Sequence, residues 1–375
     1  MRILLTGGGT GGHFYPLIAV AEAINEIVKK ENLLRPEIFF MSDAPYDAEA
    51  LVQNGIKYIP VSAGKSRRYF SILNFLDIFK TGWGVISSIF KLYSLYPDVI
   101  FSKGAYNSFP VLLAARILRI PVIIHESDTV PGRTNMWASK FATKIAISYP
   151  DTEKYFRDKD KVAYTGNPIR KEIKNTPEAS AYEYLKLDRS IPTILILGGS
   201  LGARIINESI LNALPKLVEK YQIIHQAGKN NIESVAKTSE VILTNSPYKS
   251  RYRLYDYLND LNMGMAAGAA NLIISRAGST LFEIANWGIP SIVIPITDTN
   301  GDHQRNNAYA YARSGAATVI EEANLTTNLL ISEINRLIEN KDLLQKMSDS
   351  AKNFAKLDAA SKIARELIEI SLSHE

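Results

Sequence analysis

The chain has 375 residues, of which 46% are hydrophobic and 22% are charged, and it contains no cysteine. This length suits two globular domains of ordinary size, and the lack of cysteine excludes a disulfide scaffold, a thiolate metal site and a cysteine nucleophile. The formal net charge of +5 is mild, so charge alone does not separate nucleic acid, an anionic membrane and a phosphorylated substrate as partners.

The N-terminal apolar run is short, because Arg2–Thr6 leads directly into glycines. A secretory signal needs an apolar core of roughly 7–15 residues. The longest apolar region, Phe109 to Ile124, is interrupted by Arg116, Arg119 and Pro121, and it falls short of the ~20 residues of a membrane-spanning helix. We therefore expect a cytoplasmic protein that does not cross a membrane.

Short runs rich in Ile, Val and Phe alternate with longer segments of helical periodicity, which is typical of α/β folds with parallel sheets. The first series of predicted strands is Arg2–Thr6, Glu37–Met41, Tyr58–Val61, Asp98–Ser102, Pro121–His125 and Lys144–Ser148. The second series is Thr193–Leu197, Gln222–His225, Val241–Thr244, Asn271–Ser275 and Ser291–Ile294. A polar linker near Gly166-Asn167-Pro168 separates them. We expect Rossmann-like domains at 1–165 and 166–356, with a terminal helix in 357–375 packed back on the first.

Each predicted domain opens with a strand, a run of glycines and a helix. The first loop is Gly7-Gly8-Gly9-Thr10-Gly11-Gly12, and the second is Gly198-Gly199-Ser200-Leu201-Gly202-Ala203-Arg204. Glycine lets the backbone turn tightly and approach a ligand, while free N–H groups and the helix dipole attract phosphate. The two loops predict two anion sites, and the second adds a hydroxyl and a guanidinium as donors.

The first loop also allows a different class of enzyme. Gly7, Gly9 and Gly12 satisfy G-x-G-x-x-G, and Asp43 follows the second strand where a nicotinamide enzyme has its ribose-binding acid. The second loop departs from that fingerprint, and the second half has no evident hydride-transfer site. The sequence therefore favours a sugar-nucleotide transferase and leaves an oxidoreductase as the alternative.

Polar segments follow three other predicted strands, at the sheet edge where open α/β folds bind ligands. Ser275–Thr280 starts a helix that carries Glu283, a carboxylate suited to vicinal ribose hydroxyls. Pro295–Asn307 includes Gln304, whose amide suits sugar hydroxyls, and His125–Asn135 contains several acids. The same segments also suit ordinary helix caps and solvated turns. The spacing of the five histidines, at 13, 125, 225, 303 and 374, does not indicate a metal site.

Together these segments resemble the MurG family of peptidoglycan N-acetylglucosaminyltransferases, which have the GT-B fold of two Rossmann-like domains facing a cleft. The resemblance extends over essentially the whole chain. The matching strings, in family order, are Gly8–His13, His125-Glu126 with Gly132 and Thr134-Asn135, Gly166–Arg170, Gly198–Ser200 with Gly202–Arg204, His225-Gln226 with Gly228-Lys229, Ser275–Gly278, Glu283, and His303-Gln304 with Asn307-Ala308.

The resemblance implies inverting transfer of GlcNAc from UDP-GlcNAc to the C4 hydroxyl of MurNAc in undecaprenyl-diphospho-MurNAc-pentapeptide, lipid I, giving lipid II for peptidoglycan. It implies no metal or other cofactor. Another GT-B UDP-sugar transferase with a lipid acceptor is the alternative. The implied diphosphate ligands of UDP-GlcNAc are Arg170 and Ser200, with backbone amides of Ser279 and Thr280. A backbone group near Leu258 is implied for uracil, Glu283 for ribose and Gln304 for the sugar. Thr10, Gly11, Gly12 and Asp128 are implied as further UDP-GlcNAc-binding residues. Gly9, Thr10, Gly11 and His13 are implied for the acceptor diphosphate.

Inverting transfer needs a base for the attacking hydroxyl and a stabiliser for the departing UDP. A helix N-terminus, Arg170 and loop amides can supply the stabiliser without a metal. His13 is the first candidate for the base, because imidazole has a suitable intrinsic pKa. Asp128 is the second, since a carboxylate stands here where the family usually has asparagine.

The lipid acceptor implies that the enzyme reaches the cytoplasmic leaflet without spanning it. Residues 65–83, KSRRYFSILNFLDIFKTGW, combine basic, aromatic and aliphatic side chains as interfacial segments do. We expect this segment to dock on an anionic membrane surface, so that the protein is peripheral on the cytoplasmic face. Nucleic acid is not expected as a partner.

Overall fold

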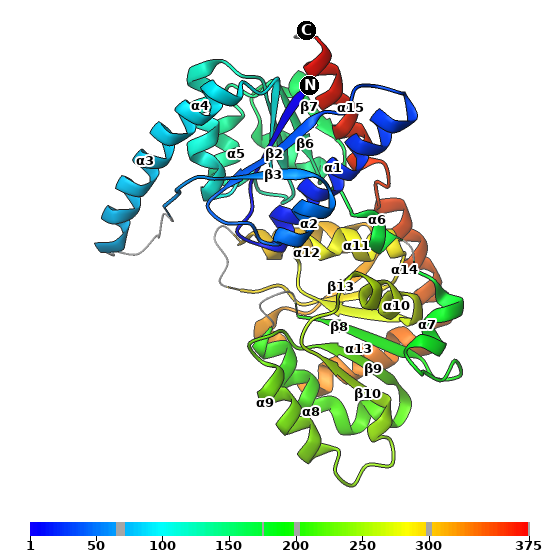
Figure 1. Cartoon of the computed structure of the whole chain (residues 1–375). Coiled ribbons are helices and arrows are strands. Elements are labelled where there is room, and N and C mark those ends of the chain that lie inside the picture. Colours follow the sequence, from blue (N-terminus) through cyan, green and yellow to red (C-terminus); the bar gives the residue numbers. More distant parts are fainter. Residues whose placement is uncertain (65–71, 175, 199–202, 298–301, 374–375) are drawn as a thin grey trace. The chain divides into compact units, whose positions relative to one another are not determined.

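Two compact units make up the chain (Figure 1). The first comprises Met1–Arg170 and Lys356–Glu375, and the second comprises Lys171–Ala355. The division at Arg170 lies a few residues beyond the position 165 that the polar linker suggests. The computed structural model describes residues 1–64, 72–174, 176–198, 203–297 and 302–373.

The first unit has a seven-stranded sheet in the order β3-β2-β1-β4-β5-β6-β7, and its neighbouring strands are parallel. The predicted class of a parallel α/β sheet is therefore confirmed here. The strands are β1 (Arg2–Thr6), β2 (Glu37–Ser42), β3 (Ile56–Pro60), β4 (Val99–Ser102), β5 (Val122–Glu126), β6 (Lys144–Ile147) and β7 (Val162–Tyr164).

Helices cover both faces of this sheet. In β1, Ile3 and Leu5 pack into the cluster with α1 and α15, whereas Leu4 packs into the cluster with α3 and α4. Successive side chains of a strand point to opposite faces, so an uninterrupted apolar run is what a doubly covered strand requires. The helices are α1 (Gly11–Lys30), α2 (Ala48–Gln53), α3 (Ile72–Leu95), α4 (Phe109–Leu118), α5 (Arg133–Ala138) and α15 (Ala359–Leu372), with short 3-10 turns η1 (Tyr106–Ser108), η2 (Pro150–Tyr155) and η3 (Lys159–Lys161).

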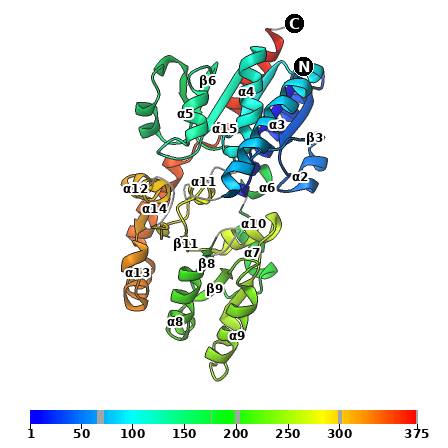
Figure 2. The same ribbon diagram turned by 90° about the vertical axis from the view of Figure 1, so that its left-hand side faces the viewer.

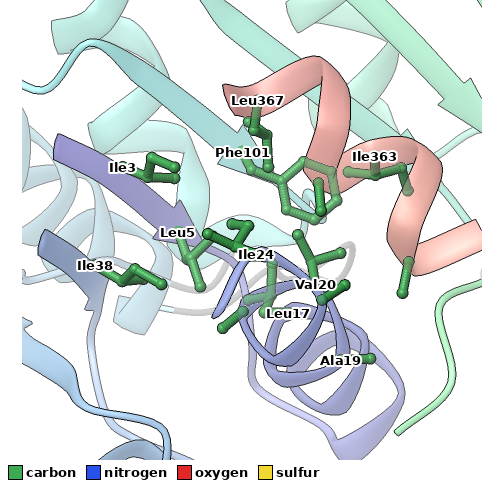
Figure 3. Close-up of a cluster of buried hydrophobic side chains, with 14 of the residues drawn as sticks. Ile3, Leu5, Leu17, Ala19, Val20, Ile24, Ile38, Phe101, Ile363 and Leu367 are labelled. Carbon is green, nitrogen blue, oxygen red and sulfur yellow. The ribbon is translucent and has the colours of Figure 1, made fainter. Parts of the chain in front are cut away.

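The last helix of the chain, α15, belongs to the core of the first unit. Its Ile363 and Leu367 lie in one buried cluster with Val20 and Ile24 of α1 and with Phe101 of β4 (Figure 3). Burying each large aliphatic side chain is worth ~1.5–3 kcal/mol. This packing explains why α1 is apolar around most of its circumference, because the sheet covers one side and α15 another.

The second unit has a six-stranded sheet in the order β10-β9-β8-β11-β12-β13, again with parallel pairs. Figure 2 labels β8, β9 and β11 of this sheet. The strands are β8 (Thr193–Leu197), β9 (Gln222–Gln226), β10 (Tyr252–Tyr255), β11 (Leu272–Ser275), β12 (Ser291–Val293) and β13 (Ala317–Val319). The helices and turns are α6 (Lys171–Lys174), α7 (Glu178–Tyr184), α8 (Arg204–Lys220), α9 (Ile232–Ile242), α10 (Asp260–Ala269), α11 (Thr280–Trp287), α12 (His303–Arg313), α13 (Thr327–Glu339), α14 (Lys341–Phe354), η4 (Lys249–Arg251) and η6 (Glu322–Asn324).

One predicted strand is wrong. Residues 241–244 contain the end of helix α9 and its C-cap Leu243, and Val235, Ser239 and Leu243 are buried at a spacing of four. A short apolar run fits a strand or a helix equally well. Here the buried positions repeat every four residues over a longer stretch, which is the period of a helix. Three strands that the sequence pattern does not predict, β7, β10 and β13, all lie at sheet edges, where short and half-exposed strands have no continuous apolar run.

The strand order of each sheet reverses once, between β1 and β4 in the first unit and between β8 and β11 in the second. Parallel sheets bind ligands at such a switch point, beyond the carboxyl ends of the strands. Both predicted glycine loops follow a strand at a switch point, β1 and β8 respectively. Each unit therefore has its loop where the fold favours a ligand.

Candidate functional site

The first glycine loop leads from β1 into the first turn of α1. Gly7 has φ +140°, and a Cβ built there would lie 3.0 Å from Cβ of Lys103, so the loop needs glycine at this point. Gly9 and Thr10 are exposed, and the Thr10 carbonyl accepts hydrogen bonds from the N–H groups of His13 and Phe14. The candidate base His13 thus lies half-buried in the first helical turn, directly after the exposed part of the loop. Gly11 and Gly12 are the first two residues of α1.

Behind this loop, the buried side chains of Lys103 and His125 form a pair at the carboxyl ends of β4 and β5. Lys103 Nζ lies 2.7 Å from His125 Nδ1 and donates to Asn167 Oδ1 at 3.1 Å. His125 Nε2 is 2.9 Å from the carbonyl oxygen of Gly166. A carbonyl only accepts, so Nε2 carries the ring proton and Nδ1 accepts from the lysine.

Burial determines the protonation of this pair. It lowers the pKa of Lys103 to about 7, against the raising effect of the Glu126 and Asp128 carboxylates. Burial, followed by the charge of Lys103, lowers the pKa of His125 well below its usual value, and His13 acts in the same direction. His125 is therefore neutral at physiological pH. His13 thus acts on His125, and Asp128 acts on Lys103, at the same edge of the sheet.

The loop after β5 is organised around the buried carboxylate of Glu126. Glu126 accepts hydrogen bonds from the N–H groups of Asp128 at 3.0 Å and Gly132 at 2.9 Å, and from Asn135 Nδ2 at 2.9 Å. Burial is the largest influence on this carboxyl and raises its pKa. Glu126 thus shapes the loop that presents the half-buried Asp128, the second candidate base.

In the second unit, the part of the glycine loop that the structure describes is Gly198 and Ala203 at its two ends. Ser200, predicted to bind diphosphate, lies outside the described residues, as do Gly199, Leu201 and Gly202. Arg204 is the first residue of α8, and its exposed guanidinium pairs with Glu208 at 2.7 Å. The added guanidinium of this loop is therefore paired on the surface of the helix.

The loop between β11 and α11 lies on the other side of the same switch point. Ser279 is the N-cap of α11 and Thr280 is its first residue, while Glu283 lies half-buried in the first turn. The N–H groups of Leu281 and Phe282 donate hydrogen bonds to backbone carbonyls of this turn. The predicted amide donors and the ribose carboxylate thus share one helix N-terminus, whose dipole favours an anion.

Arg276 braces this loop against the next one. Its Nη2 pairs with Glu322 Oε1 at 2.7 Å, and its Nη1 donates to the Ile294 carbonyl at 3.0 Å. The other oxygen of Glu322 accepts from the backbone and hydroxyl of Thr297 at 3.3 Å. Both side chains of this ion pair are largely buried, so the pair fixes the loops after β11 and β12 relative to each other.

Gln304 lies in the first turn of α12, after the loop that follows β12. Its Oε1 accepts from the Ile296 N–H at 3.3 Å, which leaves the amide group as the donor for a sugar hydroxyl. Asn307, one turn further, donates to the Ala277 carbonyl at 3.2 Å and so ties α12 to the loop after β11. Residues 298–301 of the predicted polar loop lie outside the described part of the chain.

Leu258, near which the resemblance implies a uracil contact, is anchored by a side chain. Its N–H donates to Gln226 Oε1 at 3.0 Å, at the carboxyl end of β9. That N–H is therefore engaged, and the Leu258 carbonyl is the group suited to accept from uracil N3–H. His225, the preceding residue, is buried between Asn207 Oδ1 at 2.9 Å and the Tyr252 hydroxyl at 2.8 Å.

The buried His225 predicts a loss of stability in acid. Burial lowers the pKa of His225 to about 3, whereas in the unfolded chain it is near 6.5. Between these values only the unfolded state binds the proton, so the free energy of unfolding falls by ~1.4 kcal/mol for each pH unit lowered. Urea unfolding of the wild type and His225→Gln from pH 7 to 4 measures this as a shallower slope in the variant. Equal slopes in the two proteins would contradict the role of His225. The buried His125 adds the same dependence on pH to both proteins, so the comparison isolates His225.

Sequence reasoning did not single out Lys103 or Glu322. The signal for Lys103 was available, because a lysine directly after the apolar run Val99–Ser102 lies at the ligand edge of a parallel sheet. Glu322 lies on a short turn far from the motifs in sequence, and only the fold brings it to Arg276. Among the described residues, no group of three or more His, Asp or Glu side chains could hold a metal ion.

A cavity of about 580 Å³ in the second unit lies away from these residues. Pro192, Asn271 and Pro290 in its lining each directly precede a strand, β8, β11 and β12. It therefore lies at the amino edge of the sheet, opposite the edge at which open α/β sheets bind ligands.

Two parallel-sheet units, each with a glycine loop and polar residues at its switch point, define the GT-B class of folds. The chain matches the glycosyltransferase family 28 N-terminal domain at residues 3–147 and the C-terminal domain of the same family at 193–363. It therefore belongs to glycosyltransferase family 28, and within it to the UDP-N-acetylglucosamine--N-acetylmuramyl-(pentapeptide) pyrophosphoryl-undecaprenol N-acetylglucosamine transferases, the MurG family.

Relatives of that name establish the membership. The chain is 35% identical over 370 residues to the one from Natranaerobius thermophilus, covering 97% of this chain and 98% of the relative. It is 36% identical over 358 residues to the one from Clostridium novyi, covering 94% and 95%. The crystal structure of Acinetobacter baumannii MurG has the same fold, with a TM-score of 0.72 and 24% identity over 98% of this chain and 99% of that one. The predicted GT-B fold and family are confirmed.

Proposed function

We propose that this chain transfers GlcNAc from UDP-GlcNAc to the C4 hydroxyl of MurNAc in lipid I, with inversion at the anomeric carbon, and so forms lipid II for peptidoglycan. The observation that carries this proposal is the near-full-length identity to relatives named for that transfer. The glycine loops at both switch points supply the two anion sites that a nucleotide donor and a diphosphate-linked acceptor require.

On the donor side, the helix N-terminus of α11 and the second glycine loop bind the diphosphate, together with Arg170. Glu283 accepts from the ribose hydroxyls, the Leu258 carbonyl accepts from uracil, and Gln304 donates to the sugar. As UDP departs, negative charge develops on its terminal phosphate. The dipole of α11 and the Arg170 guanidinium stabilise that charge, because each favours an anion.

On the acceptor side, the exposed Gly9 and Thr10 and the start of α1 bind the lipid diphosphate. His13, in the first turn of that helix, takes the proton from the attacking hydroxyl. Asp128 is the competing base, since its carboxylate lies on the loop after β5 and interacts electrostatically with Lys103. Thr10, Gly11, Gly12 and Asp128 also complete the binding of the donor sugar.

The direct test is transfer of radiolabelled GlcNAc from UDP-GlcNAc to purified lipid I, followed by organic extraction. We expect the label in lipid II, and β-configuration of the new bond by NMR. A protein that only binds the nucleotide would retain UDP-GlcNAc and label no lipid. Label that appears only on a different lipid acceptor would identify another transferase of the same fold.

We further propose that helix α3 docks the protein on the anionic cytoplasmic leaflet, where its lipid acceptor resides. None of the described helices is long and apolar enough to span a membrane. Figure 1 draws α3 along the outside of the first unit, next to α4. Residues 65–71, the basic start of the predicted docking segment, lie outside the described residues.

Among the described side chains of α3, seven large apolar ones are exposed. Trp83 is 67% exposed and Phe90 70% exposed, and they belong to a stripe at intervals of three and four residues. The whole stripe is Phe75, Ile78, Phe79, Trp83, Ile86, Phe90 and Tyr93. The stripe continues for about three helical turns beyond Trp83, where the docking segment predicted from the sequence ends.

The inward side of α3 has two small residues and one leucine. Gly84, Ser88 and Leu92 repeat every four residues and are buried, and a Cβ at Gly84 would overlap the Ser62 carbonyl oxygen. Gly84 and Ser88 let α3 approach its neighbours closely, while the aromatic residues of the stripe face solvent. Aromatic residues beside Lys80 suit an interface of acyl chains and anionic headgroups.

Removing two of these side chains should weaken membrane binding. For Trp83→Ser/Phe90→Ser we expect vesicle affinity to fall by about 100-fold, since each side chain buries apolar area in the interface. Sedimentation with vesicles containing an anionic phospholipid at low salt measures this. Val241→Ser, at an exposed apolar position of the second unit, is the control and should bind as the wild type does. Equal binding of the double variant and wild type would refute docking through α3.

A further inference from the structure

Arg170, the last residue of the first unit, stacks on an aromatic ring. Its guanidinium carbon lies 3.6 Å from the centre of the Tyr15 ring, a close cation–π contact. Tyr15 lies on α1, two residues after His13. The contact therefore joins the end of the segment Gly166–Arg170 to the first turns of the helix that follows the first glycine loop.

The Tyr15 ring is itself held by several neighbours. It meets Phe14 edge-on at 5.6 Å between ring centres and Tyr46 at the same distance, and its hydroxyl donates to Asp47 Oδ2 at 3.3 Å. A Cβ on Gly11 would lie 3.3 Å from the ring, so the ring rests directly against the first glycine loop. A ring held on several sides offers a fixed plane to a guanidinium.

The start of the same segment is fixed as well. Gly166 has φ +82°, and its carbonyl accepts from His125, while the buried Asn167 side chain accepts from Lys103. With Gly166 and Asn167 held by buried partners and Arg170 held by Tyr15, the segment is anchored at both ends. An arginine that is already oriented loses less conformational freedom when it binds a phosphate.

We propose that Tyr15 is a positioning residue that orients the Arg170 guanidinium for the donor diphosphate. The proposal rests on the diphosphate role of Arg170 in the proposed function. Stacking uses the face of the guanidinium, whereas the N–H groups that bind phosphate oxygens lie in its plane, so one guanidinium can do both. Tyr15 thus acts on the donor through Arg170 rather than by touching the donor itself.

The test compares variants that keep or remove the ring. We expect Tyr15→Leu to raise the KM for UDP-GlcNAc and the Kd for UDP by about fivefold to twentyfold, as the loss of a partly desolvated cation–π contact implies. The KM for lipid I should change by less than twofold. Tyr15→Phe keeps the ring and should stay within twofold of the wild type in each quantity. Tyr15→Met, which fills the volume without a ring, serves as the second ringless variant if Tyr15→Leu is poorly folded.

A double-mutant cycle with Arg170→Met separates positioning from direct contact. If Tyr15 acts through Arg170, Tyr15→Leu has no further effect on UDP affinity once the guanidinium is gone. An equal loss in the Arg170→Met background, or unchanged affinity in both ringless variants, would overturn the proposal. If Arg170→Met by itself leaves UDP binding at the wild-type level, the diphosphate role of Arg170 fails. If Arg170→Met weakens UDP binding but the ringless Tyr15 variants do not, only the inference made for Tyr15 is refuted.

Discussion

Replacing His13 by alanine is expected to lower kcat by about 10²-fold to 10⁴-fold, the usual contribution of a general base. His13 lies half-buried in the first turn of α1, immediately after the exposed Gly9 and Thr10. An alanine there cannot accept the proton of the attacking hydroxyl. UDP affinity should remain within twofold, because other residues are proposed to bind the donor diphosphate and uridine. Single-turnover transfer and calorimetry with UDP measure the two quantities separately.

The alternative role of His13 gives a different kinetic pattern. If the imidazole only binds the acceptor diphosphate, His13→Gln keeps a hydrogen-bond donor and should change the KM for lipid I more than kcat. Asp128→Asn is the matched variant for the competing base, because the amide keeps the shape of the side chain. Wild-type turnover in His13→Ala, combined with a collapse in Asp128→Asn, would transfer the base role to Asp128.

Replacing Glu283 by alanine is expected to weaken UDP binding by about 10-fold to 100-fold. Hydrogen bonds to a charged group are worth ~1.5–3 kcal/mol each, and two ribose hydroxyls can donate to this carboxylate. Glu283 is half-buried in the first turn of α11, one turn after Ser279 and Thr280. Calorimetry with UDP measures the loss. Glu339→Ala is the control, because Glu339 pairs with Lys220 on the surface of the same unit.

A change of ligand makes this test specific for ribose. In the wild type, 2′-deoxy-UDP lacks one of the donors and should bind more weakly than UDP. In Glu283→Ala the two nucleotides should bind alike, since the acceptor of the missing hydroxyl is absent. A wild-type preference for UDP that persists in the variant would assign the ribose contact to another residue.

The central strands were predictable because they are buried on both faces. A doubly covered strand such as β1 or β8 has to be continuously apolar, and a glycine run at its end marks the turn into a helix. The edge strands β7, β10 and β13 escape such a pattern, since solvent allows polar residues there. The misread run at 241–244 fails for a related reason, because four apolar residues have no period of their own.

The candidate site divides in the same way. Parallel strands have their carboxyl ends at one edge, so the sequence order alone places His13, Asp128, Glu283 and Gln304 at ligand edges of their sheets. The partners of these residues were not predictable. Nothing in sequence connects Arg276 with Glu322, 46 residues away, or Lys103 with Asn167, 64 residues away.

The exposure of α3 shows the limit of composition. Its sequence fits a core helix as well as an interfacial one, because both are rich in aromatic and aliphatic residues. Only the packing of the small residues Gly84 and Ser88 against the first unit turns Trp83 and Phe90 toward solvent. The sequence shows which residues share one side of a helix, but the neighbours of the helix decide whether that side is buried or exposed.

By itself the sequence determined the α/β class, the parallel strands, the two glycine loops and the family, because these depend on local period, on glycine and on motifs in a given order. The tertiary structure alone decided which charges are neutralised by burial, which carboxylate braces which loop, and where the guanidinium of Arg170 is held. These properties depend on distances between segments far apart in the chain. Burial shifts the pKa of Lys103 and His125, and the Tyr15 ring orients Arg170, only after folding has brought the strands together.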